Sequence, residues 1–260
     1  MTNFWCSFPF GCRHGCPLSQ ARLTRTNCNP DSFLYRHHRR LISLGGIMAV
    51  QGFNGVVDIS HYNSVSSFST VKSDGIVAVI HKATEGATYQ DSQYTSRRTA
   101  AKSAGLLWGS YHFATSSAVQ SQLDNYLGYA DPSADELICI DYESSSSGTM
   151  SLDQLEDFVT GIHQKLGRYP VVYGGSLLRE NLQGVTSTVL SSCPLWFSRY
   201  SSQPSDIPSA WSDWTLWQYT DGSSGPEPHA VNGIGNCDRD TFNGTAAELQ
   251  AQWPLTSPAS

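Results

Sequence analysis

The chain has 260 residues, of which 39% are hydrophobic and 15% charged, values that fit one soluble domain with a substantial core. Its net charge of −6 is uneven: residues 1–47 hold six arginines and one acid, which leaves ten of the 16 basic and 21 of the 22 acidic residues to the rest. An acidic domain without basic clusters excludes nucleic acid as a partner, and no apolar run reaches the roughly 18 residues that span a membrane.

Residues 1–50 are predicted to form a leader outside the folded domain, which we place at residues 51–255. The leader is rich in Cys, Arg and Pro and shows no hydrophobic periodicity up to residue 35. Arg36–Arg40 and the apolar run Leu41–Val50 resemble a secretion signal, but this signal is internal and lacks a clean cleavage site. Two interpretations stay open: a damaged secretion signal, or sequence upstream of a true start at Met48, which the composition favours.

From Val56 onward, short apolar runs alternate with segments of helical period. This alternation is typical of βα units around a parallel sheet, and the nearly continuous apolar character of the runs indicates strands buried on both faces. The predicted strands are Val56–Ser60, Ile76–His81, Leu106–His112, Leu137–Tyr142, Pro170–Tyr173, Leu195–Ser198 and Trp214–Tyr219.

Three helices are predicted between these strands. They cover Asp91–Ala104, Ala118–Ala130 and a segment that begins at Ser151, where Gln154 three residues later completes a capping-box pattern. After Pro194 the helical stretches shorten, and loops rich in Ser, Gly and Pro dominate. We therefore expect an α/β fold with a parallel sheet, and the second half of any barrel that this sheet forms should be irregular.

The candidate catalytic residues are four carboxylates: Asp58, Asp141, Glu143 and Asp238. They lie at the ends of predicted strands or, for Asp238, in a late loop, and the carboxyl ends of parallel barrel strands converge on one face. Asp141 and Glu143 are two residues apart on one strand, so their side chains share a face, roughly 6–7 Å apart. Acids this close raise one another's pKa, which keeps one protonated as a general acid, as glycosidic bond cleavage requires.

Each of these carboxylates also has a purely structural interpretation. An Asp-x-Glu triplet arises by chance in many chains, although its position after an apolar strand favours catalysis. Asp58 could cap a helix or close a turn, and Asp238 could form a surface salt bridge with Arg239. The carboxylates taken singly therefore leave both interpretations open.

Six short motifs follow one another along the chain: Asp58–Asn63, Lys82–Gly86, Gly109–Phe113, Asp141–Glu143, Trp217–Tyr219 and Asp238–Phe242. Together they resemble glycoside hydrolase family 25, the Chalaropsis-type lysozymes or N-acetylmuramidases. The resemblance implies a modified TIM-like (β/α) barrel with an irregular second half. It also implies hydrolysis of the β-1,4 bond between N-acetylmuramic acid and N-acetylglucosamine in bacterial peptidoglycan.

The resemblance further implies a role for each acid. Glu143 matches the general acid of the family, and Asp141 matches its partner on the same strand. Retention of configuration is implied, with Asp141 either orienting the 2-acetamido group of the substrate or attacking directly, and both mechanisms stay open. Asp58 and Asp238 match two supporting acidic positions, whereas Asp240 stands where the family commonly has Asn and competes with Asp238.

Aromatic side chains near strand ends are candidates for stacking on sugar rings. His112 and Lys82 are expected to serve packing and hydrogen bonding. The predicted substrate-binding residues are Tyr111, Tyr173, Trp196, Trp217 and Tyr62.

The domain contains three cysteines. Cys139 lies inside an apolar strand and is interpreted as a small buried hydrophobe, whereas Cys193 and Cys237 are predicted to form a disulfide. No cluster has metal-ligand spacing and no glycine-rich loop has phosphate-binding form, so no metal and no cofactor are expected.

The predicted protein is a secreted, monomeric, antimicrobial lysozyme whose partner is bacterial peptidoglycan. One alternative is a non-catalytic peptidoglycan- or chitin-binding module on the same barrel. Another is a chitinase-like enzyme, which is disfavoured because Leu137–Glu143 lacks the first two acids of the longer D-x-x-D-x-D-x-E strand.

Overall fold

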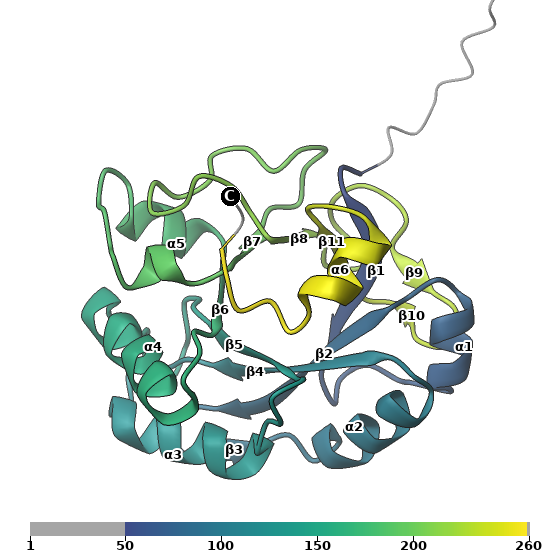
Figure 1. The fold of residues 1–260 in the computed structure, drawn as a ribbon, viewed down its shortest axis with the longest axis horizontal. Helices are drawn as coiled ribbons and strands as arrows, with labels where there is room; N and C mark the ends of the chain where they lie inside the picture. Colours follow the sequence, from purple (N-terminus) through teal and green to yellow (C-terminus); the bar gives the residue numbers. More distant parts are fainter. Residues whose placement is uncertain (1–49, 259–260) are drawn as a thin grey trace, which may run out of the picture. The chain divides into compact units, whose positions relative to one another are not determined.

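The computed structural model describes residues 50–258, and the predicted leader lies almost entirely outside them. Within the described part of the chain, eight strands close into a barrel (Figure 1). These strands are β1 (Phe53–Ile59), β2 (Ala78–Glu85), β4 (Leu107–Phe113), β5 (Leu137–Asp141), β6 (Val171–Gly174), β7 (Leu195–Ser198), β8 (Leu216–Thr220) and β11 (Asp238–Phe242). They run in the order β1-β11-β8-β7-β6-β5-β4-β2, and a β1–β2 pairing joins the two ends.

All seven predicted strands are confirmed, although β2 continues beyond its predicted end to Glu85. The eighth barrel strand, β11, corrects two expectations. It is antiparallel to both of its neighbours, β1 and β8, and it places Asp238 on a strand rather than in a loop. The strand has no apolar run because three of its five residues, Asp238, Arg239 and Asp240, are charged.

The three predicted helices are also confirmed, as α2 (Tyr94–Ser103), α3 (Val119–Ala130) and α4 (Leu152–Leu166). The capping box of α4 forms as expected. Gln154 N–H donates to Ser151 Oγ at 3.2 Å, and Ser151 N–H donates to Gln154 Oε1 at 3.0 Å.

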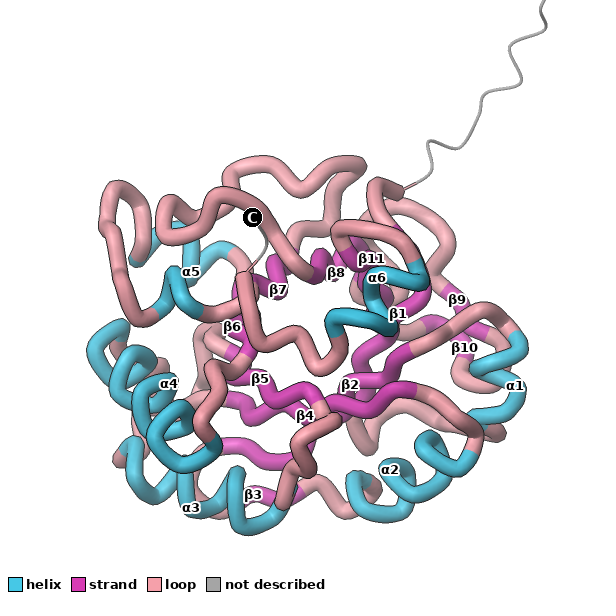
Figure 2. The backbone as a smooth tube through the Cα atoms, in the orientation of Figure 1, coloured by secondary structure: helices cyan, strands magenta, loops and turns pink. Residues whose placement is uncertain are grey.

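Helices cover the first half of the barrel far more completely than the second. With the short α1 (Phe68–Ser73), α2 to α4 flank the strands of the first half. The second half has α5 (Ser176–Asn181), the 3-10 turn η1 (Leu190–Ser192) and α6 (Ala246–Gln252), and Figure 2 shows loops over most of this side. The short strands β3 (Tyr89–Gln90), β9 (Ala230–Val231) and β10 (Gly235–Asn236) lie outside the barrel wall, β3 pairing with β2 and β9 with β10. The prediction of an irregular second half is confirmed, and no helix in residues 50–258 is long and apolar enough to cross a membrane.

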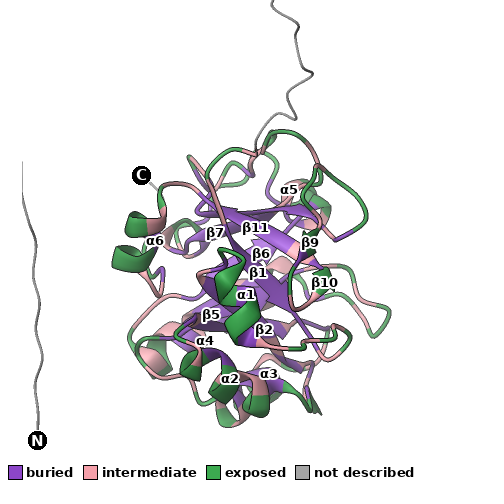
Figure 3. Ribbon diagram, turned by 90° about the vertical axis from the view of Figure 1, so that its right-hand side faces the viewer, coloured by how far each residue is buried: buried purple, intermediate pink, exposed green. Residues whose placement is uncertain are grey.

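Alternate residues of each barrel strand belong to two different cores. Outward side chains such as Val57 and Ile140 pack beneath the helices and loops. Inward side chains such as Val56 and Leu137 fill the barrel, where Leu249 of α6 joins them. Figure 3 shows the buried strands enclosed by exposed helices. This alternation decides which residues can reach the barrel interior.

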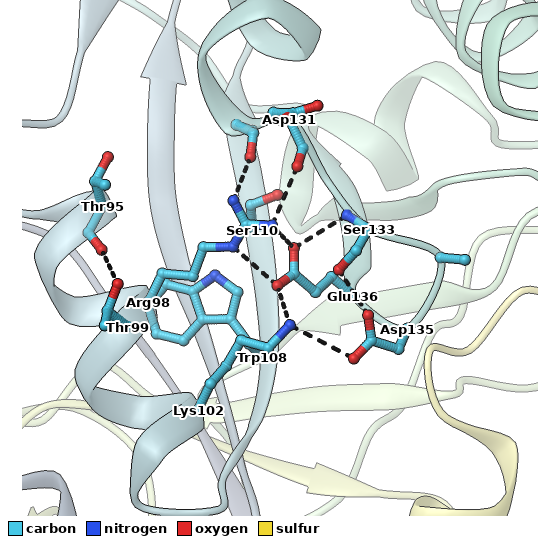
Figure 4. A network of polar contacts seen from close by, with 12 residues as sticks. Thr95, Arg98, Thr99, Lys102, Trp108, Ser110, Asp131, Ser133, Asp135 and Glu136 are labelled. Atoms are coloured by element: carbon cyan, nitrogen blue, oxygen red, sulfur yellow. Dashed lines mark hydrogen bonds and ion pairs between the residues drawn. The ribbon is translucent and has the colours of Figure 1, made fainter.

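A buried glutamate links α2 to the segment that precedes β5 (Figure 4). The side chain of Glu136 is 1% exposed. It accepts hydrogen bonds from Arg98 Nε at 2.9 Å and Nη2 at 2.6 Å, and from Lys102 Nζ at 2.6 Å. Charge-assisted hydrogen bonds of this kind are the stronger ones in proteins, so the cluster fixes α2 beside the strand that carries Asp141.

Replacing Glu136 with alanine should lower the free energy of unfolding by about 2–3 kcal/mol, because Arg98 and Lys102 lose a buried acceptor. Urea unfolding measures the change. The matched control is Asp135→Ala, since the Asp135 side chain is 73% exposed and lies 3.5 Å from Lys102. It should change stability by about 0–1 kcal/mol. Equal losses in the two variants would contradict the structural role of Glu136.

Candidate active site

The carboxyl ends of the parallel strands surround an open cavity of about 240 Å³. Its lining includes the four predicted catalytic carboxylates, Asp58, Asp141, Glu143 and Asp238. Because β11 is antiparallel, its first residue rather than its last lies at this end, and Asp238 pairs with Asp58 of β1. The fold thus brings together acids from three separate strands.

Asp141 and Glu143 reach the cavity from the same strand end. Asp141 closes β5, and the backbone N–H of Tyr142 still donates to Tyr173 O of β6 at 2.9 Å. The Tyr142 side chain belongs to the outer core, where its hydroxyl accepts from Asn181 Nδ2 at 2.8 Å. Residues on either side of Tyr142 therefore face inward, as the period of two predicts.

Burial raises the pKa of each of these carboxyls. For Asp141 desolvation is the largest cause, the negative charge of Glu143 adds to it, and the charge of Lys82 opposes it. Desolvation also raises the pKa of Glu143, and it raises the pKa of Asp238 to about 6. Asp141 and Glu143 line one cavity and the charge of Glu143 acts on Asp141, so the pair keeps a proton to higher pH than a solvated carboxyl would.

Gln218 of β8, the central residue of the Trp217–Tyr219 motif, orients Asp58, a role that the sequence did not predict. Its Nε2 donates to Asp58 Oδ2 at 2.8 Å. Its Oε1 accepts from the hydroxyls of Tyr173 at 2.8 Å and Tyr200 at 3.0 Å, and from Ser198 Oγ at 3.2 Å. These hydroxyls fix the amide so that its NH₂ group points toward Asp58. The available signal was a polar residue within an otherwise buried, largely apolar strand.

Four of the five predicted sugar-binding aromatics line the cavity: Tyr62, Tyr111, Tyr173 and Trp196. The structure corrects the prediction for Trp217, which is fully buried in the outer core. The indole Nε1 of Trp217 donates to Arg199 O at 2.7 Å, and the ring lies 5.9 Å from that of Trp214. Successive strand residues face opposite sides, so the neighbour of the inward-facing Gln218 faces outward.

Lys82 was expected to serve packing and hydrogen bonding, and in the structure it also lines the cavity. Its ammonium group pairs with Glu85 Oε2 at 2.5 Å and lies 4.9 Å from the centre of the Phe113 ring. His112 is buried on the outer face, where its ring nitrogens lie 2.8 Å from Thr84 Oγ1 and 3.2 Å from Gln122 Oε1. The expected role of His112 in packing and hydrogen bonding is confirmed.

Cys139, Cys193 and Cys237 are all free and buried. The predicted disulfide between Cys193 and Cys237 is therefore wrong. Both residues follow loop-like sequence, yet each fills an apolar position of the outer core. Cys139 lies inside the barrel as the small hydrophobe that was predicted.

Comparison with known proteins agrees with this geometry. Residues 57–227 match the model of the family described as "Glycosyl hydrolases family 25". The chain is 30% identical over 227 residues to Lysozyme M1 of Streptomyces globisporus, which covers 82% of this chain and 74% of that protein. It is 29% identical over 205 residues to N,O-diacetylmuramidase of Chalaropsis sp, with coverages of 71% and 94%.

The fold is similar to that of a family GH25 lysozyme from Aspergillus fumigatus, with a TM-score of 0.65 and 32% identity over 80% of this chain and 100% of that one. The match of the family model over more than half of the chain, together with the closed barrel, confirms the resemblance stated from the six motifs. The chain is therefore a glycoside hydrolase and belongs to glycosyl hydrolase family 25.

Proposed function

We propose that this enzyme hydrolyses the β-1,4 bond between N-acetylmuramic acid and N-acetylglucosamine in bacterial peptidoglycan, with retention and with Glu143 as general acid. The observation that carries the proposal is the meeting of Glu143 with three aspartates around one cavity with aromatic walls. Burial raises the pKa of Glu143, which favours the protonated form that a leaving glycosidic oxygen needs.

In the proposed reaction, Glu143 donates its proton to the glycosidic oxygen while the bond from that oxygen to C1 of the muramic acid breaks. Asp141 Oδ1 is buried and accepts no hydrogen bond from the described residues. This oxygen suits the N–H of the 2-acetamido group, whose carbonyl oxygen then attacks C1 from the opposite face. Water, deprotonated by Glu143, opens the resulting ring and retains the configuration. Direct attack by Asp141 is the alternative with the same stereochemical outcome.

Asp58 and Asp238 support this step from the other side of the barrel. They enter the cavity from the paired strands β1 and β11, and Gln218 holds the Asp58 carboxylate in place. Negative charge fixed in a partly desolvated cavity stabilises the positive charge that develops at C1. We assign both aspartates supporting roles.

Analysis of the reaction products tests the proposal. Digestion of purified peptidoglycan, followed by borohydride reduction and mass spectrometry, should reveal reduced muramic acid at the new chain ends. Reduced glucosamine would contradict the proposed bond, and wall binding without new reducing ends would instead support a peptidoglycan-binding module. The first anomer seen by proton NMR with soluble fragments should be β, whereas an α anomer would contradict retention.

Tyr62 is expected to bind a sugar ring at the rim of the cavity. The side chain lines the cavity yet is 85% exposed, so a sugar can cover an aromatic face that is now solvated. Tyr62→Ala should raise KM for soluble peptidoglycan fragments about 5–10-fold, as expected for about 1 kcal/mol of stacking. The melting temperature should not change, because few contacts are lost.

Steady-state kinetics on Tyr62→Ala can be compared with Tyr169→Ala. Tyr169 precedes β6, at the opposite end of the barrel, and stacks on His163 at 4.1 Å. Its removal should leave KM unchanged. An equal rise of KM in both variants would argue against sugar stacking on Tyr62.

We further infer that the enzyme is secreted, because its proposed substrate lies outside the cytoplasmic membrane. N-terminal sequencing of the natural protein tests this inference. Enzyme recovered outside the producing cells, with a mature chain that begins after the apolar run Leu41–Val50, would fit it, and enzyme found only in the cytosol would contradict it.

A further inference from the structure

A short turn after β1, which we call the rim loop (residues 60–63), forms part of the cavity wall. Ser60 and Tyr62 of this loop both line the cavity. Asn63 N–H donates to Ser60 O at 3.1 Å, and Ser60 N–H donates to Asn63 Oδ1 at 2.9 Å, so the loop is a closed turn. The Tyr62 side chain is 85% exposed, so contacts elsewhere on the loop must fix its position.

Arg97 of α2 binds both ends of the rim loop. Its Nη1 donates to Ser60 O at 2.7 Å, and its Nη2 donates to Asn63 O at 2.6 Å. The same Nη1 lies 3.2 Å from Nε2 of His81 on β2. An arginine can only donate, so this imidazole nitrogen accepts, and burial lowers the pKa of His81 to about 4 and keeps the ring neutral. One guanidinium thus joins the first and last residues of the loop to the barrel wall.

Asp91 holds the middle of the rim loop. Its side chain is 0% exposed, and its Oδ2 accepts from the backbone N–H of His61 at 2.9 Å and lies 2.9 Å from His61 Nδ1. Its Oδ1 accepts from Gln93 N–H at 2.9 Å. The backbone of Asp91 is fixed as well, because its N–H donates to Ala83 O at 2.8 Å and its carbonyl accepts from the Tyr129 hydroxyl at 2.7 Å. Asp91 is therefore a rigid point of attachment for His61.

His61 connects this attachment to the exposed Tyr62. The centres of the two rings are 3.9 Å apart, with 37° between their planes. The Tyr89 hydroxyl lies 3.0 Å from His61 Nδ1 and restrains the imidazole further. The Tyr62 ring therefore rests on a side chain that a buried carboxylate holds, while most of its own surface stays free.

Arg97 differs in this respect from its neighbour on α2. Arg98 donates from Nε and Nη2 to Glu136, which precedes β5. Arg98 therefore attaches the helix to the barrel, whereas Arg97 gives its hydrogen bonds to the rim loop and His81. The two neighbouring arginines allow attachment of the helix to be separated from positioning of the loop.

We propose that Arg97 and Asp91 are positioning residues that hold the rim loop so that Tyr62 presents its ring to a sugar at the cavity. A loop that is already ordered loses less conformational freedom when substrate binds, so its release should weaken binding. The four carboxylates come from β1, β11 and the end of β5 rather than from this loop, so kcat should change little. The effect on binding rests on the proposed function, whereas the fixed loop is a property of the protein without substrate.

A double-mutant cycle between Arg97 and Tyr62 tests the proposal. Arg97→Ala should raise KM for soluble peptidoglycan fragments about 3–10-fold and change kcat less than about 2-fold. In a Tyr62→Ala background the same substitution should raise KM less than about 2-fold, because no ring is left to present. Equal rises of KM in the two backgrounds, or an unchanged KM in Arg97→Ala, would overturn the proposal.

Asp91→Asn tests the second attachment in the same way. The amide sets an NH₂ group against an N–H donor of His61 or Gln93, so KM should rise when Tyr62 is present and stay nearly constant when it is replaced. A KM that does not respond to Asp91→Asn would overturn the role of Asp91.

Arg98→Ala is the matched control, because it loosens α2 without removing a hydrogen bond to the rim loop. It should lower the free energy of unfolding and leave KM unchanged. A rise of KM equal to that of Arg97→Ala would show that a loosened helix is sufficient and would overturn the proposal. If Arg97→Ala does not fold, Arg97→Lys serves in the same cycle, since a single ammonium group keeps the charge but cannot bridge two carbonyls as the guanidinium does.

NMR of the protein without substrate separates this inference from the proposed function. The nuclear Overhauser signal between the rings of His61 and Tyr62 should weaken in Arg97→Lys and in Asp91→Asn and persist in Arg98→Ala. A signal that stays at full intensity in all three variants would overturn the fixed loop. A protein that shows the expected pattern but releases no muramic acid ends would refute the proposed function and leave the inference about the loop standing.

Discussion

Glu143→Gln should reduce the rate of peptidoglycan hydrolysis by about 10²–10⁴-fold, the usual contribution of a positioned general acid. The amide has nearly the same shape as the carboxyl but no proton that it can give to a leaving oxygen. Glu143 follows the last residue of β5 and projects into an open cavity, so little packing depends on it. The variant should fold as the wild type does and still bind bacterial walls.

Two measurements separate catalysis from binding in this variant. Loss of turbidity of a bacterial wall suspension, with kcat on soluble fragments, reports hydrolysis, and sedimentation with walls reports binding. The matched control is Glu156→Gln on α4, which makes the same chemical change on a helix outside the barrel. Wild-type activity in Glu143→Gln would refute its assignment as general acid.

The sequence predicts the strands of the barrel well because seven of them are apolar runs. A strand buried on both faces leaves little room for polar residues, as in β5, where only Asp141 is polar. β11 departs from this pattern because it carries Asp238 and Asp240 into the barrel and Arg239 outward. When the inward residues of a strand are polar because they belong to an active site, its hydrophobicity pattern does not distinguish it from a polar loop.

The sequence motifs predict which residues belong to the site, but not which face of each strand points into the barrel. Asp58, Asp141 and Glu143 follow from acids at the ends of predicted strands that converge on one rim, whereas Asp238 was predicted in a late loop near that rim. Whether Trp217 or Gln218 faces the barrel interior depends on which face of β8 points inward. The sequence does not reveal this, because both faces of β8 carry apolar residues. Pairing of β8 with an antiparallel β11 resolves it, and that pairing is a tertiary property.

Asp238→Asn should make the protein more stable at neutral pH and less active. Folding raises the pKa of Asp238 from an ordinary value of 3.8 to about 6, chiefly because the carboxyl is buried. The folded state then binds the proton more tightly than the unfolded state does. The contribution of Asp238 to the free energy of unfolding is fully present below about pH 4 and is lost as the pH rises through about 6. Above that pH the ionised carboxylate lowers the free energy of unfolding by at most about 3 kcal/mol.

Urea unfolding across this pH range checks the prediction. The stability gained by Asp238→Asn should be near zero at about pH 4 and should grow to its full value above about pH 6. Asp157→Asn, at an exposed position on α4, serves as the control and should show no such trend. A difference between Asp238→Asn and the wild type that stays constant with pH would show that the ionisation of Asp238 does not destabilise the fold.

Activity should move in the opposite direction to stability. If Asp238 supports positive charge at C1, its ionised form is the active one, and wild-type kcat should fall as the pH drops below about 6. Asp238→Asn should have a lower kcat and lack this acid limb, while the alkaline loss caused by deprotonation of Glu143 remains. The ionised Asp238 thus lowers the stability of the fold while it raises the rate of the reaction. Stability and activity are therefore expected to change in opposite directions at this end of the barrel.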